Sequence, residues 1–166
     1  MSFRNIDKEQ YGRRLKVAFF SICLYMLTVS LATSSILIYF FGVEGENFWL
    51  NVAGIIVAAS GLLLIYKRVK SHYYLQDIIY VRGIKAQLNY IYRKLNKLKV
   101  AAEKGDETAM AVLDYSYKAS MYVYKLDDNT LTMEELNAAQ KELQQWMEQY
   151  QVLSLTGYQQ ELLANY

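Results

Sequence analysis

The 166-residue sequence contains no proline, one cysteine and one histidine. The absence of proline removes the residue that most often breaks helices, and the many Leu, Ala, Lys, Glu and Gln residues favour an all-α fold. Because Cys23 has no second cysteine to pair with, an intramolecular disulfide, a redox CxxC motif and a thiolate-bound metal cluster are excluded. A zinc site with several histidine ligands is excluded in a monomer as well, since His72 stands alone.

The sequence also lacks the motifs that mark common enzyme and cofactor sites. It has no glycine-rich phosphate loop, no nucleophile elbow and no HExxH pattern. The run Asp127-Asp128-Asn129 lacks the alternating ligands, central glycine and late glutamate of a calcium loop, and is predicted to lie in a turn ending at Thr130. We therefore predict a non-enzymatic protein without catalytic, cofactor-binding or metal-binding residues.

Two long apolar segments are the most informative feature of the chain. Residues 17–41 form 25 consecutive residues without a charge, and residues 48–66 form 19 more. At about 1.5 Å per residue, each segment is long enough to cross roughly 30 Å of hydrocarbon as a helix. The first segment is too long for a cleaved signal peptide and is followed at once by the second. We predict a transmembrane helical hairpin over residues 17–66, with its turn at residues 42–47.

The charges that flank the hairpin predict its orientation. The basic, amphipathic lead-in of residues 1–16 has five basic and two acidic residues, whereas the turn carries only Glu44 and Glu46. By the positive-inside rule, both termini should lie in the cytoplasm. The cations predicted to lie at the membrane interface, near anionic lipid headgroups, are Arg13, Arg14, Lys16, Lys67, Arg68 and Lys70.

Small residues recur along both apolar segments at helical spacing. Such residues let helix backbones approach closely. They predict packing within the hairpin, and the alternative is a contact between hairpins of an oligomer. The residues concerned are Ala32, Gly54, Ala58 and Gly61.

The remaining chain is predicted to form a cytoplasmic domain over residues 67–153, followed by a C-terminal tail at residues 154–166 that frays. A heptad pattern predicts one long helix over residues 73–104, and Gly105 with Asp106 predicts a turn into a second helix over residues 107–125. A capping box of Thr132 and Glu135 predicts the start of a third helix. The three helices are expected to form an antiparallel bundle with Leu88, Leu95, Leu113, Leu143 and Trp146 in its core.

Charge is distributed unevenly along this domain. Residues 67–99 contain nine basic residues and one acidic residue, whereas residues 100–166 contain four basic and eleven acidic residues. The distal cations Arg93, Lys94 and Lys97 are predicted either to pair with acids such as Glu107, Asp114 or Glu134, or to dock an acidic partner. Nucleic-acid binding is a less favoured explanation for the same basic residues.

Several short segments together resemble a bacterial family of unknown function, numbered 3087. The resemblance implies a small inner-membrane protein and implies no activity, cofactor or catalytic residue. The segments that carry it are residues 7–11, 47–48, 51–54, 70–72, 87–95 and 126–133.

We therefore predict a multi-pass inner-membrane protein that acts as a protein-interaction or scaffold module. Its expected partners are the membrane, another protein or a second copy of itself. The alternative is an oligomeric accessory subunit of a transporter or channel, in which the hairpins associate through Gly54, Ala58 and Gly61.

Overall fold

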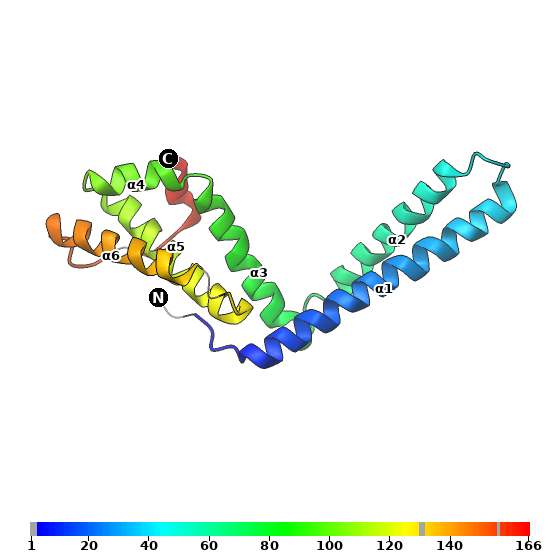
Figure 1. The fold of residues 1–166 in the computed structure, drawn as a ribbon, viewed down its shortest axis with the longest axis horizontal. Coiled ribbons are helices and arrows are strands. Elements are labelled where there is room, and N and C mark those ends of the chain that lie inside the picture. Colours follow the sequence, from blue (N-terminus) through cyan, green and yellow to red (C-terminus); the bar gives the residue numbers. More distant parts are fainter. Residues whose placement is uncertain (1–2, 130–131, 156) are drawn as a thin grey trace. The chain divides into compact units, whose positions relative to one another are not determined.

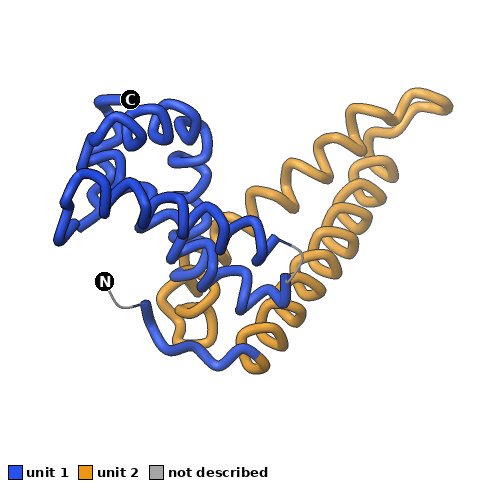
Figure 2. The backbone as a smooth tube through the Cα atoms, turned by 60° about the vertical axis from the view of Figure 1, so that its left-hand side comes forward, with its two compact units in different colours: residues 1–8, 80–166 blue, residues 9–79 orange. Residues whose placement is uncertain are grey.

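The computed structural model describes residues 3–129, 132–155 and 157–166. Within these ranges every regular element is a helix, so the predicted all-α fold class is confirmed. The chain divides into two compact units (Figure 2). We call Glu9–Ile79 the hairpin unit, and Met1–Lys8 together with Tyr80–Tyr166 the helical unit.

The hairpin unit contains two long helices that run antiparallel, α1 (Lys8–Phe41) and α2 (Phe48–Val69) (Figure 1). Helix α1 begins well before the apolar segment, so the basic lead-in continues into it from Lys8 onward. The connecting loop turns at Gly45, whose φ of 84° lies in the left-handed region that glycine adopts without strain. The side-chain oxygen of Asn47 accepts a hydrogen bond from the Val43 amide at 3.1 Å, which ties the two sides of the loop together.

The single helix predicted for residues 73–104 is two helices. Helix α3 (Tyr73–Tyr92) ends before Arg93, and α4 (Leu95–Glu103) begins two residues later. At the break the Lys94 amide bonds the carbonyl of Ile91, three residues back, instead of continuing the α-helical pattern. Neither glycine nor proline occurs at the break, so local sequence gave no sign of it.

Helix α5 (Glu107–Asp127) is the central element of the helical unit (Figure 1). It packs against α4, α6 and the C-terminal segment. The predicted turn before it is confirmed: Gly105 has a φ of 92°, and the Asp106 carboxylate accepts from the Thr108 and Ala109 amides at 2.9 and 3.1 Å. Eleven of its residues are buried, which makes it the core helix of this unit.

Helix α6 (Met133–Gln149) begins where a third helix was expected, but the capping box is not formed. Thr132 has φ −99° and ψ 3°, outside the extended region from which an N-cap side chain reaches the first turn. Its hydroxyl is buried without a hydrogen-bond partner among the described residues. The predicted loop before α6 lies partly outside the described residues, at Thr130.

The described residues of the C-terminal segment pack against the rest of the helical unit, whereas the sequence predicted a segment that frays. It ends in a short 3-10 helix, η1 (Gln160–Asn165), in which Leu163 is buried. The Lys94 ammonium donates to the Leu163 carbonyl at 2.5 Å, and the Lys97 ammonium donates to the main-chain oxygen of Tyr166 at 2.8 Å. The Tyr166 hydroxyl donates to Asp106 at 2.8 Å.

The core of the helical unit contains part of the predicted set. Leu113 and Leu143 are fully buried, as predicted. Leu88 and Leu95 are half-buried instead, because the seam is divided between α3 and α4. Trp146 on α6 is also half-buried. Fully buried side chains that complete the core include Val81, Ile91, Leu98, Met110 and Val112.

Candidate functional surfaces

Arg14 lies at the start of α1 and contacts the first turns of α3 inside the hairpin unit. Its guanidinium donates to the Asp77 carboxylate at 3.3 Å. The guanidinium carbon also lies 5.7 and 5.2 Å from the ring centroids of Tyr73 and Tyr74, within the range of a cation–π contact. Only 15% of the Arg14 side chain is exposed, so this cation is held within the protein.

The other five cations at this end of the hairpin are exposed. None of them has an acidic partner within the part of the chain that the structure describes. Two are on α1 and three are on or just after α2. They are Arg13, Lys16, Lys67, Arg68 and Lys70, and we call them the inner-end cations.

Small residues on α2 form the contact between the two hairpin helices. A Cβ atom on Gly54 would lie 2.7 Å from the Ser30 carbonyl oxygen and 3.0 Å from Ser34, so the backbones touch there. Ala58, one turn further on, is fully buried. At Gly61 a Cβ would collide with the Tyr25 hydroxyl. These three positions on α2 face α1.

The matching face of α1 differs from the one expected. Ser34 is buried and hydrogen-bonded to Asn51, and Tyr25 lies over Gly61. Ala32 is exposed, as are Thr28 and Ser35, so this face points away from α2. Ala32 therefore takes no part in packing within the hairpin, and a contact between hairpins remains a prediction for it.

In the helical unit, both ends of the chain pack on aromatic residues of α5. The Phe3 ring stacks on Tyr122 with centroids 4.9 Å apart, and the Tyr158 ring stacks on Tyr115 with centroids 4.2 Å apart. Phe3 also lies 6.3 Å from Tyr115, so the four rings form one group that we call the aromatic column. The Tyr122 hydroxyl donates to the Arg4 carbonyl at 3.0 Å, which holds the N-terminal segment in place.

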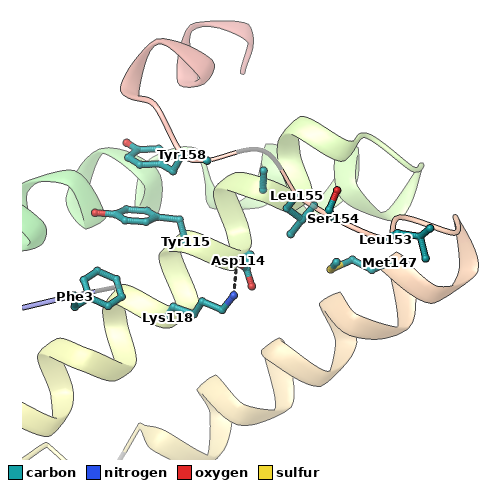
Figure 3. A pocket seen from close by; sticks show the side chains of 11 residues that line it. Phe3, Asp114, Tyr115, Lys118, Met147, Leu153, Ser154, Leu155 and Tyr158 are labelled. Carbon is teal, nitrogen blue, oxygen red and sulfur yellow. Dashed lines mark hydrogen bonds and ion pairs between the residues drawn. The ribbon is translucent and has the colours of Figure 1, made fainter. Parts of the chain in front are cut away.

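A cavity of about 270 Å³ lies beside the aromatic column (Figure 3). Figure 3 shows Phe3, Tyr115 and Tyr158 on one side of it, and Met147 and the segment after α6 on the other. Its charged residues, Asp114 and Lys118, are bonded to each other at 2.7 Å. Leu153 lines the rim and is 98% exposed. We call this the α5 cavity.

A second cavity of about 430 Å³ is lined by residues of α3 to α6, including Leu88, Tyr117 and Leu136. The ion pair of Lys85 and Asp127, 2.6 Å apart, lines the same cavity. Tyr117 is 4% exposed, and its hydroxyl has no hydrogen-bond partner among the described residues. Such a buried, unpaired hydroxyl costs free energy.

The buried phenols have raised pKa values. Burial, with smaller contributions from Tyr158 and Tyr80, raises the pKa of Tyr115 to about 12. Burial, with a contribution from the Glu142 carboxylate, also raises the pKa of Tyr117 to about 12. Both phenols are therefore protonated at physiological pH and do not act as bases, and the Tyr115 hydroxyl donates a hydrogen bond to Gln87.

The distal cations have partners of another kind than expected. Lys94 and Lys97 bond main-chain oxygens of the C-terminal segment, and Arg93 is exposed. For Lys94 and Lys97 the C-terminal segment supplies the acceptors in place of the predicted acids. Docking of an acidic partner, the other predicted role of these cations, stays a prediction. The basic and acidic halves do pair elsewhere, at Lys85 with Asp127 and at Lys99 with Glu142, the latter at 3.8 Å.

A comparison with known families adds the decisive observation. A family model described as "Protein of unknown function (DUF3087)" matches residues 1–163. The chain belongs to the DUF3087 family. The resemblance found in the sequence is thereby confirmed over both units. Neither the curated proteins nor the solved structures include a match to this chain.

Two features of this DUF3087 protein escaped the sequence reasoning. The first is the aromatic column, in which Phe3 and Tyr158 stack on α5. Helical periodicity predicts only that Tyr115 and Tyr122, two turns apart, lie on one face of α5. The second is the face of α1 that meets α2, which contains Ser30 and Ser34. Their four-residue spacing equals that of Thr28 and Ala32 on the predicted face, so spacing alone does not distinguish the two faces. In the described parts of the DUF3087 chain, no group of three or more His, Cys, Asp or Glu residues is placed to hold a metal ion.

Proposed function

We propose that this DUF3087 protein is an integral inner-membrane protein in which α1 and α2 cross the bilayer as a hairpin. The supporting observation is that large apolar side chains cover the outside of both helices. Phe20, Leu31 and Leu64, for example, are 68%, 65% and 68% exposed. The core helix of a soluble protein would bury such side chains, because leaving them in water costs about 1.5 to 3 kcal/mol each. Both helices are also long and apolar enough to span a membrane.

The proposed orientation places both termini and the helical unit in the cytoplasm. All the inner-end cations are at one end of the hairpin, and Glu44 and Glu46 are in the loop at the other end. Basic residues are retained on the cytoplasmic side during insertion. The packing of α4 and α6 on α5 supports a helical bundle, and the orientation of the hairpin would place this bundle in the cytoplasm.

Cysteine labelling in intact cells tests the orientation. In a Cys23→Ser background, Gly45→Cys should react with a membrane-impermeant maleimide, whereas Asp128→Cys should react only after lysis. Both positions are exposed, so accessibility of the thiol depends on the side of the membrane and not on burial. Labelling at Asp128 with protection at Gly45 would show the opposite orientation. Extraction of the protein by carbonate without detergent would refute the transmembrane hairpin itself.

We further propose that the helical unit is a non-enzymatic module that binds another protein. The support comes from the α5 cavity and its rim. Its walls are aromatic and aliphatic, its one carboxylate, Asp114, is bonded to Lys118, and its phenols are protonated. Such a surface suits binding of apolar side chains better than proton transfer. Leu153, which is 98% exposed at the rim, is an apolar side chain that a partner would cover.

Photocrosslinking tests this role in cells. A photoreactive amino acid at Leu153 should give a discrete crosslinked band, and one at Lys141, an exposed residue on α6, should not. Filling the cavity with Ala111→Trp should remove the Leu153 band, since Ala111 lines it. Equal crosslinking at both positions, or a band that persists in Ala111→Trp, would contradict binding at the α5 cavity.

The alternative of a transporter or channel subunit has less support. It requires hairpins to associate through Gly54, Ala58 and Gly61, and these residues face α1 of the same chain. Because α1 already covers these residues, they are not accessible to a second hairpin.

A further inference from the structure

We infer that the inner-end cations form a binding surface for the headgroup of an anionic phospholipid. The inference rests on the proposed membrane hairpin. It adds to the proposed orientation a specific ligand, a lipid with a negatively charged headgroup. It concerns Arg13, Lys16, Lys67, Arg68 and Lys70, all within the hairpin unit.

The register of the hairpin brings these cations to one level. Ser34 on α1 is hydrogen-bonded to Asn51 on α2, which fixes one pair of facing residues. In an antiparallel pair, equal steps along the two helices keep residues level, since each residue rises about 1.5 Å. Lys70 and Leu15 are each nineteen residues from this pair, so Lys70 lies level with the residue next to Lys16. Cations from both helices therefore surround the same end of the hairpin.

Within the hairpin unit, none of the described acidic residues forms an ion pair with these cations. Within the hairpin unit, the Asp77 carboxylate already bonds Arg14. Glu9 is the other acidic residue of the hairpin unit at this end. Five exposed cations and the one further carboxylate, Glu9, leave a net positive charge at this end of the hairpin unit, and a bound anion would reduce it.

The surroundings of the cations select a lipid over a free anion. Phe20, one turn into the apolar part of α1 from Lys16, is 68% exposed, and Val17 is 49% exposed. On α2, Leu64 lies one turn before Arg68 and is 68% exposed. An anion that carries an acyl chain contacts both kinds of surface at once, whereas inorganic or glycerol phosphate contacts only the cations.

Arg14 is not one of the inner-end cations, and only the structure shows the reason. In sequence it is indistinguishable from Arg13, but its guanidinium is bonded to Asp77 and packed on two tyrosines. On α1 the lipid headgroup therefore contacts Arg13 and Lys16, whereas Arg14 has a structural role.

Native mass spectrometry of the purified full-length protein in detergent provides the test. The probes are phosphatidylglycerol and phosphatidylcholine with identical acyl chains. The variant is Lys16→Gln/Lys67→Gln/Lys70→Gln. The matched control is Lys104→Gln/Lys125→Gln/Lys141→Gln, which removes the same charge from exposed positions of the helical unit.

The wild-type protein should bind phosphatidylglycerol at least about tenfold more tightly than phosphatidylcholine. Each cation near an anionic surface contributes about a fivefold gain in affinity, so the triple variant should lose this preference and the control should keep it. Raising the salt concentration should weaken binding of phosphatidylglycerol and leave phosphatidylcholine unchanged, because only the first depends on charge. Glycerol phosphate should not displace the bound phosphatidylglycerol.

Equal affinity for the two lipids in the wild-type protein would overturn the inference while leaving the membrane hairpin intact. An equal loss of the preference for phosphatidylglycerol in the control would overturn it too. Net charge, and not this surface, would then determine which lipid binds. Displacement of phosphatidylglycerol by glycerol phosphate would show that the cations bind free phosphate and that the acyl chains do not contribute. Binding of neither lipid would count against the proposed membrane hairpin itself.

Discussion

Replacing Leu113 with alanine should lower the free energy of unfolding of the helical unit by about 2 to 5 kcal/mol. Leu113 is fully buried in α5, the helix that packs against α4, α6 and the C-terminal segment. Removing its side chain takes away apolar contacts and leaves a cavity that the surrounding helices fill only in part. For a domain of this size, the loss should lower the melting temperature by roughly 8 °C or more.

Two other leucines provide the comparison for this measurement. Leu95 was expected in the same core but is half-buried, so Leu95→Ala should cost less than Leu113→Ala. Leu153 is 98% exposed, and Leu153→Ala should leave the melting temperature unchanged. Thermal unfolding of the full-length protein in detergent, followed by circular dichroism, measures all three. A cost for Leu95→Ala as large as that for Leu113→Ala would contradict the division of the seam between α3 and α4.

Alkaline pH should destabilise the helical unit through its buried phenols. The pKa of Tyr115 and of Tyr117 is raised from 10.0 to about 12 in the folded state. Because the folded state binds these protons more tightly than the unfolded state, the stabilisation is present below pH 10 and is lost as the pH rises toward 12. A shift of about two units corresponds to at most about 3 kcal/mol for each phenol.

Phenylalanine variants distinguish the contribution of each phenol from that of the other groups that titrate in this range. Tyr117→Phe should reduce the loss of stability between pH 9 and 12 without destabilising the protein at neutral pH, because its hydroxyl has no partner. Tyr115→Phe should also reduce the alkaline loss, but it should destabilise the protein at neutral pH by about 1 kcal/mol, since its hydroxyl bonds Gln87. Melting temperatures of the three proteins over this pH range test both statements. An unchanged pH profile in both variants would show that other groups cause the alkaline loss.

Features that depend on neighbouring residues were predictable from the sequence. The two long apolar helices follow from length and hydrophobicity alone. The turn at Gly105 and the cap at Asp106 follow from glycine's tolerance of positive φ and from a carboxylate two or three residues before the amides it accepts from. Family membership was also readable, because its segments are spread along the chain in order.

The candidate surfaces were predictable only in part. The inner-end cations were identified as a group by their position beside the apolar segments, but Arg14 could not be set apart from them. Its partner Asp77 is 63 residues away in the sequence. The small residues of α2 lie on the face that meets α1, whereas the face of α1 that carries Ala32 is exposed. Spacing identifies a face of a helix but does not say which face meets the neighbour.

The sequence by itself determined the class of fold, the extent of the apolar helices and the local turns, because these depend on propensities and hydrophobic patterns of short segments. Only the tertiary structure decided where α3 ends, how the C-terminal segment docks and that Arg14, unlike Arg13, bonds Asp77. Lys94 at the break bonds the Leu163 carbonyl, 69 residues away, and Phe3 stacks on Tyr122, far away in the chain. Such contacts repay the entropy of closing long loops only when many form together, so no short segment of the sequence encodes them.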